Sequence, residues 1–190
     1  MVRLKPRLIL ASSSPRRARI LESLGLKFVV RPADVDETLL PGESPRAAVL
    51  RLARMKVGVP NRRPVDCVLA ADTLVAMGSR VLGKPRHRAE AAAMLRSLSG
   101  RTHTVITGVA VWWRGTVRTV VDRTEVRFRV MDRAEIARYV RTGEPLDKAG
   151  AYHVEGGGAA FIEAISGSPS NVAGLSVTTA RRLLKRAGWF

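Results

Sequence analysis

The sequence predicts a single α/β domain. Segments with the apolar pattern of short strands alternate along the chain with segments that carry helix caps and a helical apolar stripe. The 190 residues are 46% hydrophobic, which is enough to build one sizeable core. No internal repeat, low-complexity tract or linker interrupts the alternation, so we expect residues 1–190 to form one folding unit.

The first elements are a short apolar strand at 7–11 and a helix that begins after it. Ser14 is a favoured helix N-cap and Pro15 a favoured first helical residue, and Gly25 marks the end of this helix. A second strand is expected at 27–31.

A loop separates this strand from the next helix. Residues 34–43 are rich in Asp, Pro and Gly, which favours a loop. Ser44 and Pro45 then repeat the same capping pair, so a second helix is expected to run to about Gly58. A buried strand at 68–77 follows it.

The second half begins with a helix at 88–100, followed by two long β-rich segments at 102–113 and 116–130. Arg114 and Gly115 lie between these segments and predict a hairpin turn.

The last third of the chain contains two more predicted helices. One is capped by Asp132, and an amphipathic helix is expected at 177–188. Residues 144–171 between them are rich in glycine and hold one predicted strand, at 159–165. Such a long irregular stretch in a compact domain is usually functional or disordered.

Composition excludes several classes of protein. The longest apolar runs are far shorter than a membrane helix requires, and the apolar run near the N-terminus is too short for a signal peptide. Cys67 is the only cysteine, so no disulfide can form within the chain, and we expect a cytoplasmic location.

The chain is strongly basic. It contains 33 Lys and Arg against 16 Asp and Glu, a formal net charge of +17. Such a charge attracts phosphate-rich partners, although many arginines can also simply coat a surface. The charge is spread along the chain and not gathered into one arm, which argues against a nucleic-acid partner.

Asp72 breaks the pattern of its predicted strand, because its neighbours on both sides are apolar. Burying a carboxylate without a partner costs several kcal/mol, so Asp72 needs a cation, a metal ion or solvent beside it. It is either a hydrogen-bonded structural residue or a general base or metal ligand at the end of a strand.

Two lysines are candidates to accompany it. Lys56 lies on the apolar face of its predicted helix, four residues after Leu52, where a snorkelling side chain is the alternative to a functional one. Lys84 lies in a Gly-Lys-Pro turn and can equally be an ordinary loop cation. If the three converge, they suit a phosphate and a metal.

The junction between the first strand and the first helix is a candidate anion site. Ser12, Ser14, Arg16 and Arg17 supply hydroxyl and guanidinium donors beside the free N–H groups of a helix start. Two arginines in a first helical turn oppose the helix dipole, and an anionic ligand would resolve that conflict. Asp36 and Glu37 have the hard oxygens that magnesium prefers, or are solvated loop acids.

A series of motifs resembles the Maf family of nucleoside triphosphate pyrophosphatases, also called septum formation inhibitor proteins. The motifs cover about residues 7 to 186 and are, in order, ASSSPRR, the Asp36-Glu37 pair, RLARMK, AADT, GKP, LSG-x-x-H-x-V-x-TG, GEPLDKAGAY and EGGGAAF...GSPSNVAGL. Any one of them is weak, but eight in sequence are specific.

The resemblance implies a fold and a reaction. The fold is α/β, related to the inosine triphosphate pyrophosphatases, with a mixed central sheet flanked by helices and two lobes separated by a cleft. The reaction is hydrolysis of a nucleoside triphosphate to the monophosphate and pyrophosphate with a divalent cation, Mg²⁺ or Mn²⁺, in a homodimer.

The resemblance also implies roles for particular residues. Asp72 matches the catalytic proton acceptor, Lys56 and Lys84 match the motif lysines, and Glu37 matches an acidic position of the metal region, with Asp72 as a further metal ligand. The positions matching substrate-binding residues are Ser12, Arg16, Arg17, Thr73, Lys148 and Glu155.

Base preference rests on three marker positions. Arg16 and Thr73 follow the branch that acts on dTTP and UTP, whereas Glu155 stands where that branch has glutamine. An ionised glutamate accepts hydrogen bonds but cannot donate them. We therefore expect dTTP and UTP, including modified pyrimidine nucleotides, with 7-methyl-GTP as the alternative.

Two rival functions stay open at this point. A non-catalytic basic protein could bind nucleic acid or a cell-division partner, and a related enzyme could act on another nucleotide conjugate. The sequence leaves the metal, the oligomeric state and the cellular role open, nucleotide cleansing or division arrest.

Overall fold

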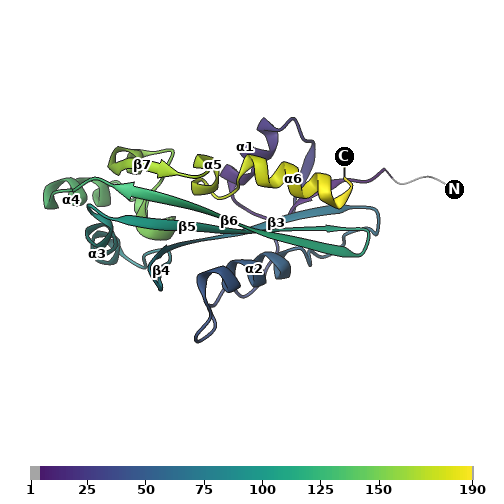
Figure 1. Ribbon diagram of the computed structural model, residues 1–190, viewed down its shortest axis with the longest axis horizontal. Helices are drawn as coiled ribbons and strands as arrows, with labels where there is room; N and C mark the ends of the chain where they lie inside the picture. The colour runs from purple at the N-terminus through teal and green to yellow at the C-terminus, as the bar shows by residue number, and fades with distance from the viewer. Residues whose placement is uncertain (1–4, 190) are drawn as a thin grey trace. The chain divides into compact units, whose positions relative to one another are not determined.

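The computed structural model describes residues 5–189, and its elements follow the expected alternation (Figure 1). The strands are β1 (Leu8–Leu10), β2 (Phe28–Val30), β3 (Cys67–Met77), β4 (Arg80–Leu82), β5 (Thr102–Trp113), β6 (Thr116–Phe128) and β7 (Ile162–Ser166). The α-helices are α1 (Pro15–Ser23), α2 (Pro45–Lys56), α3 (Arg88–Leu98), α4 (Arg133–Arg141), α5 (Pro169–Val172) and α6 (Val177–Ala187). The 3₁₀ helices are η1 (Glu144–Asp147), η2 (Ala149–Ala151) and η3 (Gly157–Phe161).

The strands form one seven-stranded sheet in the order β2-β1-β3-β5-β6-β7, with β4 paired to β3. β1 is parallel to both β2 and β3, whereas β4 is antiparallel to β3 and β7 is antiparallel to β6. The expected mixed sheet is therefore confirmed. Within residues 5–189, no helix has both the length and the apolar character that a membrane crossing demands.

Local signals predicted most elements correctly. Ser14 and Ser44 cap α1 and α2, and a proline follows each cap as expected. Arg114 and Gly115 both have positive φ angles, of 49° and 82°, as a tight hairpin turn between β5 and β6 requires.

Four features were not predicted. β4 is a three-residue strand, the strand in the glycine-rich region begins at Ile162 and not at 159, the three 3₁₀ helices η1 to η3 lie within residues 144–161, and α5 is a short helix. These short pieces depend on contacts with distant parts of the chain and have no periodic pattern long enough to detect.

The chain divides into two compact units, in agreement with the two lobes that the family resemblance implies. The first unit contains residues 5–72, 107–122 and 174–189, and the second contains residues 73–106 and 123–173. β3, β5 and β6 each pass from one unit into the other, and each unit is described separately below.

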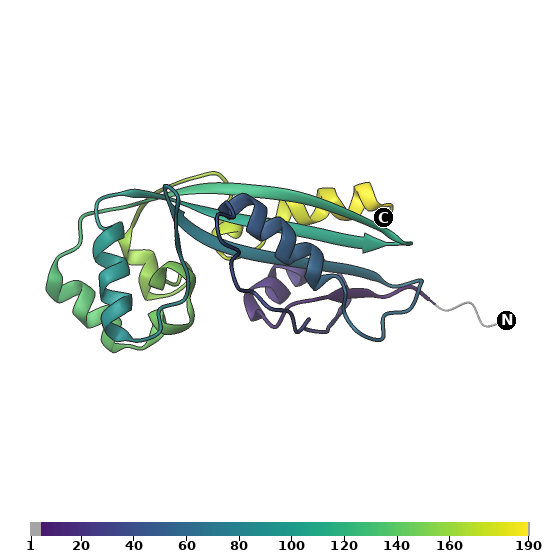
Figure 2. The ribbon, with the colours of Figure 1, turned by 90° about the horizontal axis from the view of Figure 1, so that it is seen from below.

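In the first unit, helices cover both faces of the sheet. α2 lies on one face and α1 and α6 lie on the other (Figures 1 and 2). The approach of α2 to β5 depends on Gly108, because a Cβ atom there would lie 2.1 Å from the backbone oxygen of Val49. Only glycine therefore fits under the helix that carries Lys56.

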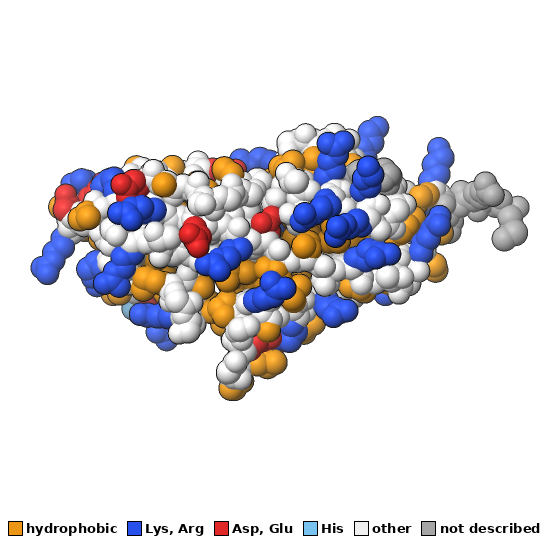
Figure 3. All heavy atoms as spheres, viewed as in Figure 1, with side chains coloured by type: hydrophobic (Ala, Val, Ile, Leu, Met, Phe, Trp, Pro, Cys, Tyr) orange, Lys and Arg blue, Asp and Glu red, His pale blue; other side chains and the backbone are white. Residues whose placement is uncertain are grey.

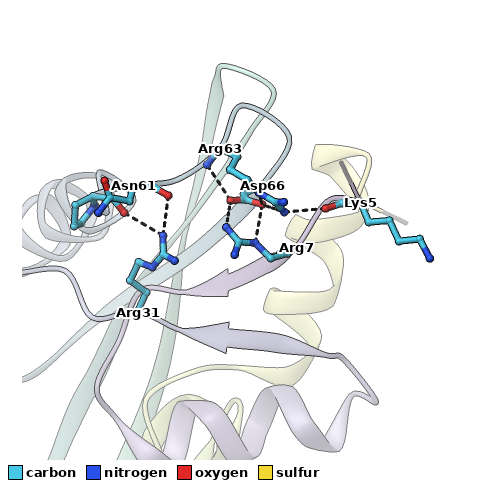
Figure 4. Close-up of polar contacts among 7 residues, drawn as sticks. Lys5, Arg7, Arg31, Asn61, Arg63 and Asp66 are labelled. Atoms are coloured by element: carbon cyan, nitrogen blue, oxygen red, sulfur yellow. Dashed lines mark hydrogen bonds and ion pairs between the residues drawn. The ribbon is translucent and has the colours of Figure 1, made fainter. Parts of the chain in front are cut away.

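A buried carboxylate fastens the start of β1 to the start of β3. Asp66 is fully buried and accepts hydrogen bonds from the guanidinium groups of Arg7 and Arg63 and from the backbone N–H of Arg63 (Figure 4). Burial acts to raise the pKa of Asp66, but these hydrogen bonds outweigh it and hold that pKa well below its usual range. Asp66 was not singled out from the sequence.

In the second unit, α3 and α4 pack together over a core of aliphatic and aromatic side chains. His103 lies within this core, 2% exposed, with Nε2 2.9 Å from the hydroxyl of Tyr152 and its ring edge-to-face with Phe128. Burial lowers the pKa of His103 to about 4, so the imidazole is neutral near pH 7.

Candidate active site

The candidate site in the first unit is built where β1 ends beside its parallel neighbour β3. Leu10 of β1 pairs with Leu69 of β3, so the segment that follows β1 and the continuation of β3 lie at the same edge. Ser12 lies two residues after the end of β1, and Asp72 lies three residues beyond Leu69. Carboxyl ends of strands are where α/β folds commonly place ligands.

Asp72 and Lys56 form a buried ion pair at this edge. Asp72 is 6% exposed and Lys56 is 7% exposed, and Nζ of Lys56 lies 2.5 Å from Oδ1 of Asp72. Of the partners considered for Asp72, which were a cation, a metal ion and solvent, the structure has a lysine cation beside it. The last residue of α2 supplies this cation, because the apolar stripe of α2 faces the sheet.

Glu37 contacts the same lysine. Its Oε1 lies 2.6 Å from Nζ of Lys56, while its side chain stays 59% exposed. One ammonium group is thus shared between a buried carboxylate and an exposed one. Such a pair of carboxylates is partly neutralised and open to solvent on the Glu37 side.

Arg51 holds the loop that carries Glu37. From α2, its guanidinium forms two hydrogen bonds to the carboxylate of Glu43, at 2.8 and 2.7 Å, and donates to the backbone oxygen of Thr38 at 3.0 Å. Asp36 accepts a hydrogen bond from the N–H of Thr38 and so shapes the loop itself. Arg51 was missed in the sequence, where nothing but its helical position distinguishes it from the many other arginines.

Ser12 and Arg17 are brought together at the start of α1. The hydroxyl of Ser12 accepts hydrogen bonds from the N–H of Ser14, at 3.2 Å, and from Nη1 of Arg17, at 3.1 Å. Nε of Arg17 donates to the backbone oxygen of Gly174 at 2.9 Å. The positive charge that opposes the helix dipole is thus directed back toward the protein.

Electrostatic interactions tie this junction to the buried ion pair. Burial lowers the pKa of the Arg17 guanidinium, and the negative charges of Asp72 and Glu37 act in the opposite direction. Arg17 therefore lies within electrostatic range of both carboxylates.

Arg16 differs from Arg17 in its partners. Its Nε atom is buried, yet within residues 5–189 it has no hydrogen-bond partner. Buried donors are normally satisfied, so an unpaired one at a helix start is suited to a ligand oxygen. A phosphate or carboxylate group would supply it.

The metal expectation can be tested against the donors that are present. Within the described part of the chain, no group of three or more His, Cys, Asp or Glu side chains is arranged to hold a metal ion. Glu37 and Asp72 supply two carboxylates on one lysine, and Mg²⁺ commonly uses one or two carboxylates together with substrate phosphates. These residues fit a cation that binds together with a nucleotide.

The remaining predicted site residues belong to the second unit. Thr73 follows Asp72 in β3 and is partly buried, Lys84 and Glu155 are exposed, and Lys148 contacts the carboxylate of Asp147. The loops that carry Lys84 and Lys148 are tied together, because the N–H of Gly150 donates to the backbone oxygen of Gly83 at 3.1 Å.

Cys67 has no part in this chemistry. It is fully buried in β3, and burial raises the pKa of its thiol to about 12. A neutral, inaccessible thiol is a core residue.

Basic side chains are spread widely and not concentrated. Figure 3 shows Lys and Arg distributed over the whole face in view, with acidic side chains less frequent among them. This distribution agrees with the sequence, in which the net charge of +17 has no single basic segment.

A match to a protein-family model shows the family of this chain. The model of the family described as Maf-like protein matches residues 7–187, nearly the entire chain. The chain belongs to the Maf family. The resemblance read from the motifs is confirmed.

Curated relatives of this Maf protein agree with the match. The dTTP/UTP pyrophosphatase of Anaeromyxobacter dehalogenans is 53% identical over 188 residues, which cover 97% of this chain and 95% of the relative. The dTTP/UTP pyrophosphatase of Myxococcus xanthus is 51% identical over 182 residues, covering 95% and 92%.

One solved structure shares the fold at low sequence identity. The HAM1 protein from Coxiella burnetii has a TM-score of 0.54 and 17% identity, and the match covers 96% of this chain and 100% of that one. At this identity the likeness shows the fold alone.

Proposed function

We propose that this Maf protein hydrolyses dTTP and UTP to the nucleoside monophosphate and pyrophosphate, with a divalent cation. The observation that carries the proposal is the buried pair of Asp72 and Lys56, with Lys56 shared with Glu37, in the middle of β3. The names of the relatives at 53% and 51% identity support the substrate.

The start of α1 binds the polyphosphate in this proposal. The unpaired Nε of Arg16 and the N–H groups of the first helical turn donate to phosphate oxygens. Arg17 holds Ser12 in place and adds positive charge. These groups stabilise the negative charge that develops on the phosphoryl oxygens during the reaction.

Asp72 and Lys56 act on the attacking water. We assign to Asp72 the role of accepting a proton from that water and to Lys56 the role of holding the carboxylate in position. Mg²⁺ or Mn²⁺, bound with Glu37 and Asp72, would polarise the phosphate and lower the pKa of water. Lys84 and Lys148 belong to the second unit, and the roles that the family resemblance gives them stay predictions.

Base preference is proposed to follow Arg16, Thr73 and Glu155. Two of these three match the dTTP/UTP branch, and both relatives carry that name. Glu155 is the departure, since a carboxylate in place of an amide removes one donor to the base. We expect dTTP and UTP to be the preferred substrates despite this change.

One assay tests the proposal. Pyrophosphate release is measured from dTTP, UTP, CTP, GTP and 7-methyl-GTP, each with Mg²⁺, with Mn²⁺ and with a chelator. Release from dTTP and UTP that needs the cation supports the proposal. Faster pyrophosphate release from 7-methyl-GTP than from dTTP and UTP would identify 7-methyl-GTP, the alternative, as the substrate.

The non-catalytic reading has its own outcome in the same experiment. No release from any nucleotide, together with tight binding of duplex DNA at physiological salt, would indicate a basic binding protein instead. The homodimer and the cytoplasmic location expected from the sequence stay predictions.

A further inference from the structure

A hydrogen-bonded network in the second unit surrounds the carboxylate of Glu144, at the start of η1. Its Oε1 accepts from the hydroxyl of Tyr139 at 2.7 Å and from the N–H of Gly158 at 3.3 Å. Its Oε2 accepts from the N–H of Gly157 at 3.2 Å. One side chain thereby ties α4 to the beginning of η3.

The same network reaches the other end of the loop. The hydroxyl of Tyr139 also accepts from the N–H of His153 at 3.0 Å. This hydroxyl therefore donates to Glu144 and accepts from His153. Residues 153–158 are therefore held at their first residue through Tyr139 and at their last two through Glu144. Glu155 lies between these two attachment points and is exposed.

The run of glycines follows from this packing. A Cβ atom on Gly156 would lie 2.7 Å from Oε2 of Glu144, and one on Gly158 would lie 2.7 Å from the backbone nitrogen of His153. No larger residue fits without moving the loop. The glycines therefore let the backbone close around the carboxylate, and they do not indicate a flexible segment.

The carboxylate is kept in its charged form. Burial acts to raise the pKa of Glu144, but the hydrogen bonds from Tyr139, Gly157 and Gly158 outweigh it, and the pKa is lowered overall. A charged acceptor makes stronger hydrogen bonds than a neutral one.

We propose that Glu144 is a positioning residue for base selection: by fixing the loop 153–158 it sets the place of Glu155, one of the three positions assigned to base preference. This role rests on the proposed function, in which Glu155 contacts the base. Glu144 itself touches neither substrate nor metal in this proposal and acts through the loop backbone.

The test compares Glu144→Gln with the wild-type protein. Glutamine keeps the shape of the side chain but turns one acceptor oxygen into a donor that faces other donors. We expect KM for dTTP to rise about tenfold with kcat changed less than about threefold, as for a lost hydrogen bond to a charged group. The ratio of kcat/KM between dTTP and 7-methyl-GTP should fall by a similar factor.

A second variant and a second measurement keep the test independent of folding. Tyr139→Phe removes the shared hydroxyl but keeps the ring contact with Phe161, and it should change the base ratio in the same direction. Amide hydrogen exchange at Gly157 and Gly158 should be faster in both variants. Glu163→Gln, which alters an exposed pair with Arg127, is the matched control and should change neither quantity.

The outcomes separate the two proposals. If the wild-type protein releases no pyrophosphate from any nucleotide, both the proposed function and this role are overturned. If the wild-type protein is active and both variants keep its base ratio and KM, the role of Glu144 alone is overturned, whether or not exchange at the glycines is faster.

Discussion

Asp66 and Asp72 are both buried in the first unit, one just before β3 and one within it. Their negative charges are compensated by different sets of donors. Asp66 is surrounded by donors from Arg7 and Arg63. Among the described residues, the donor that reaches Asp72 is Nζ of Lys56, which Glu37 shares.

The difference separates a structural carboxylate from one that is available for chemistry. Every lone pair of Asp66 faces a fixed donor, so neither a water nor a cation can compete for it. Asp72, in the middle of β3, keeps acceptor capacity and shares its lysine with an exposed carboxylate. Burial alone would not distinguish them, because both side chains are below a tenth exposed.

The largest expected effect is on activity and comes from Asp72→Asn, which removes the carboxylate that is proposed to take part in the reaction. Pyrophosphate release from dTTP should fall by about 10²–10⁴, the usual contribution of a general base. The variant should still fold, because Lys56 keeps its contact with Glu37. Turnover within about threefold of wild type would remove Asp72 from the mechanism.

The free energy of unfolding at acid pH reports on Asp66 once the separate contribution of His103 is known. The pKa of His103 is about 4 in the folded protein against 6.5 when unfolded, so the unfolded state binds the proton more readily. The contribution of neutral His103 to the free energy of unfolding is fully present above pH 6.5. It should decrease by at most about 3 kcal/mol between pH 6.5 and 4. Denaturant unfolding across this range measures the loss.

A matched variant isolates this effect. His103→Gln lacks the titrating ring and should flatten the profile between pH 6.5 and 4. The contribution of Asp66, whose pKa is lowered from 3.8, is present above that value and is lost only at lower pH. An unchanged slope in the variant would assign the acid sensitivity to another group.

Asp66→Asn removes the structural carboxylate and should change stability, not activity. It leaves two guanidinium groups without their carboxylate, and we expect a loss of about 2–3 kcal/mol in unfolding free energy, below the full range for a buried pair because Arg7 and Arg63 keep contact with water. At a temperature where the variant is folded, kcat should match wild type. A kcat reduced as far as in Asp72→Asn would contradict the division of roles.

The smallest effect is expected from Arg51→Met, which frees the loop that carries Glu37. The Mg²⁺ concentration for half-maximal release should rise about tenfold, since a bidentate charged hydrogen bond no longer fixes the loop. Saturating Mg²⁺ should restore most of the rate. A Mg²⁺ dependence identical to wild type would show that Arg51 does not position Glu37.

Much of the fold could be predicted because its signals are local. The Ser-Pro pairs at Ser14 and Ser44 fix helix starts within a few residues, and Arg114 with Gly115 fixes a turn. β4 and η3 lack such signals, since β4 depends on pairing with β3 and η3 begins where the carboxylate of Glu144 binds the N–H of Gly157.

The site was predictable only in part. Asp72 and Lys56 stood out because each contradicts the apolar pattern around it. Arg51, Asp66 and Glu144 did not, because a charged residue in a loop or on a helix looks the same whether it is solvated or holds two segments together.

The sequence by itself determined the family, the order of elements and the residue types that chemistry needs, because caps, apolar periodicity and motifs are properties of neighbouring residues. Only the tertiary structure decided which carboxylate is saturated and which is open, and which arginine of the first helix keeps an unpaired donor. These depend on distances between residues far apart in the chain, which no local pattern records.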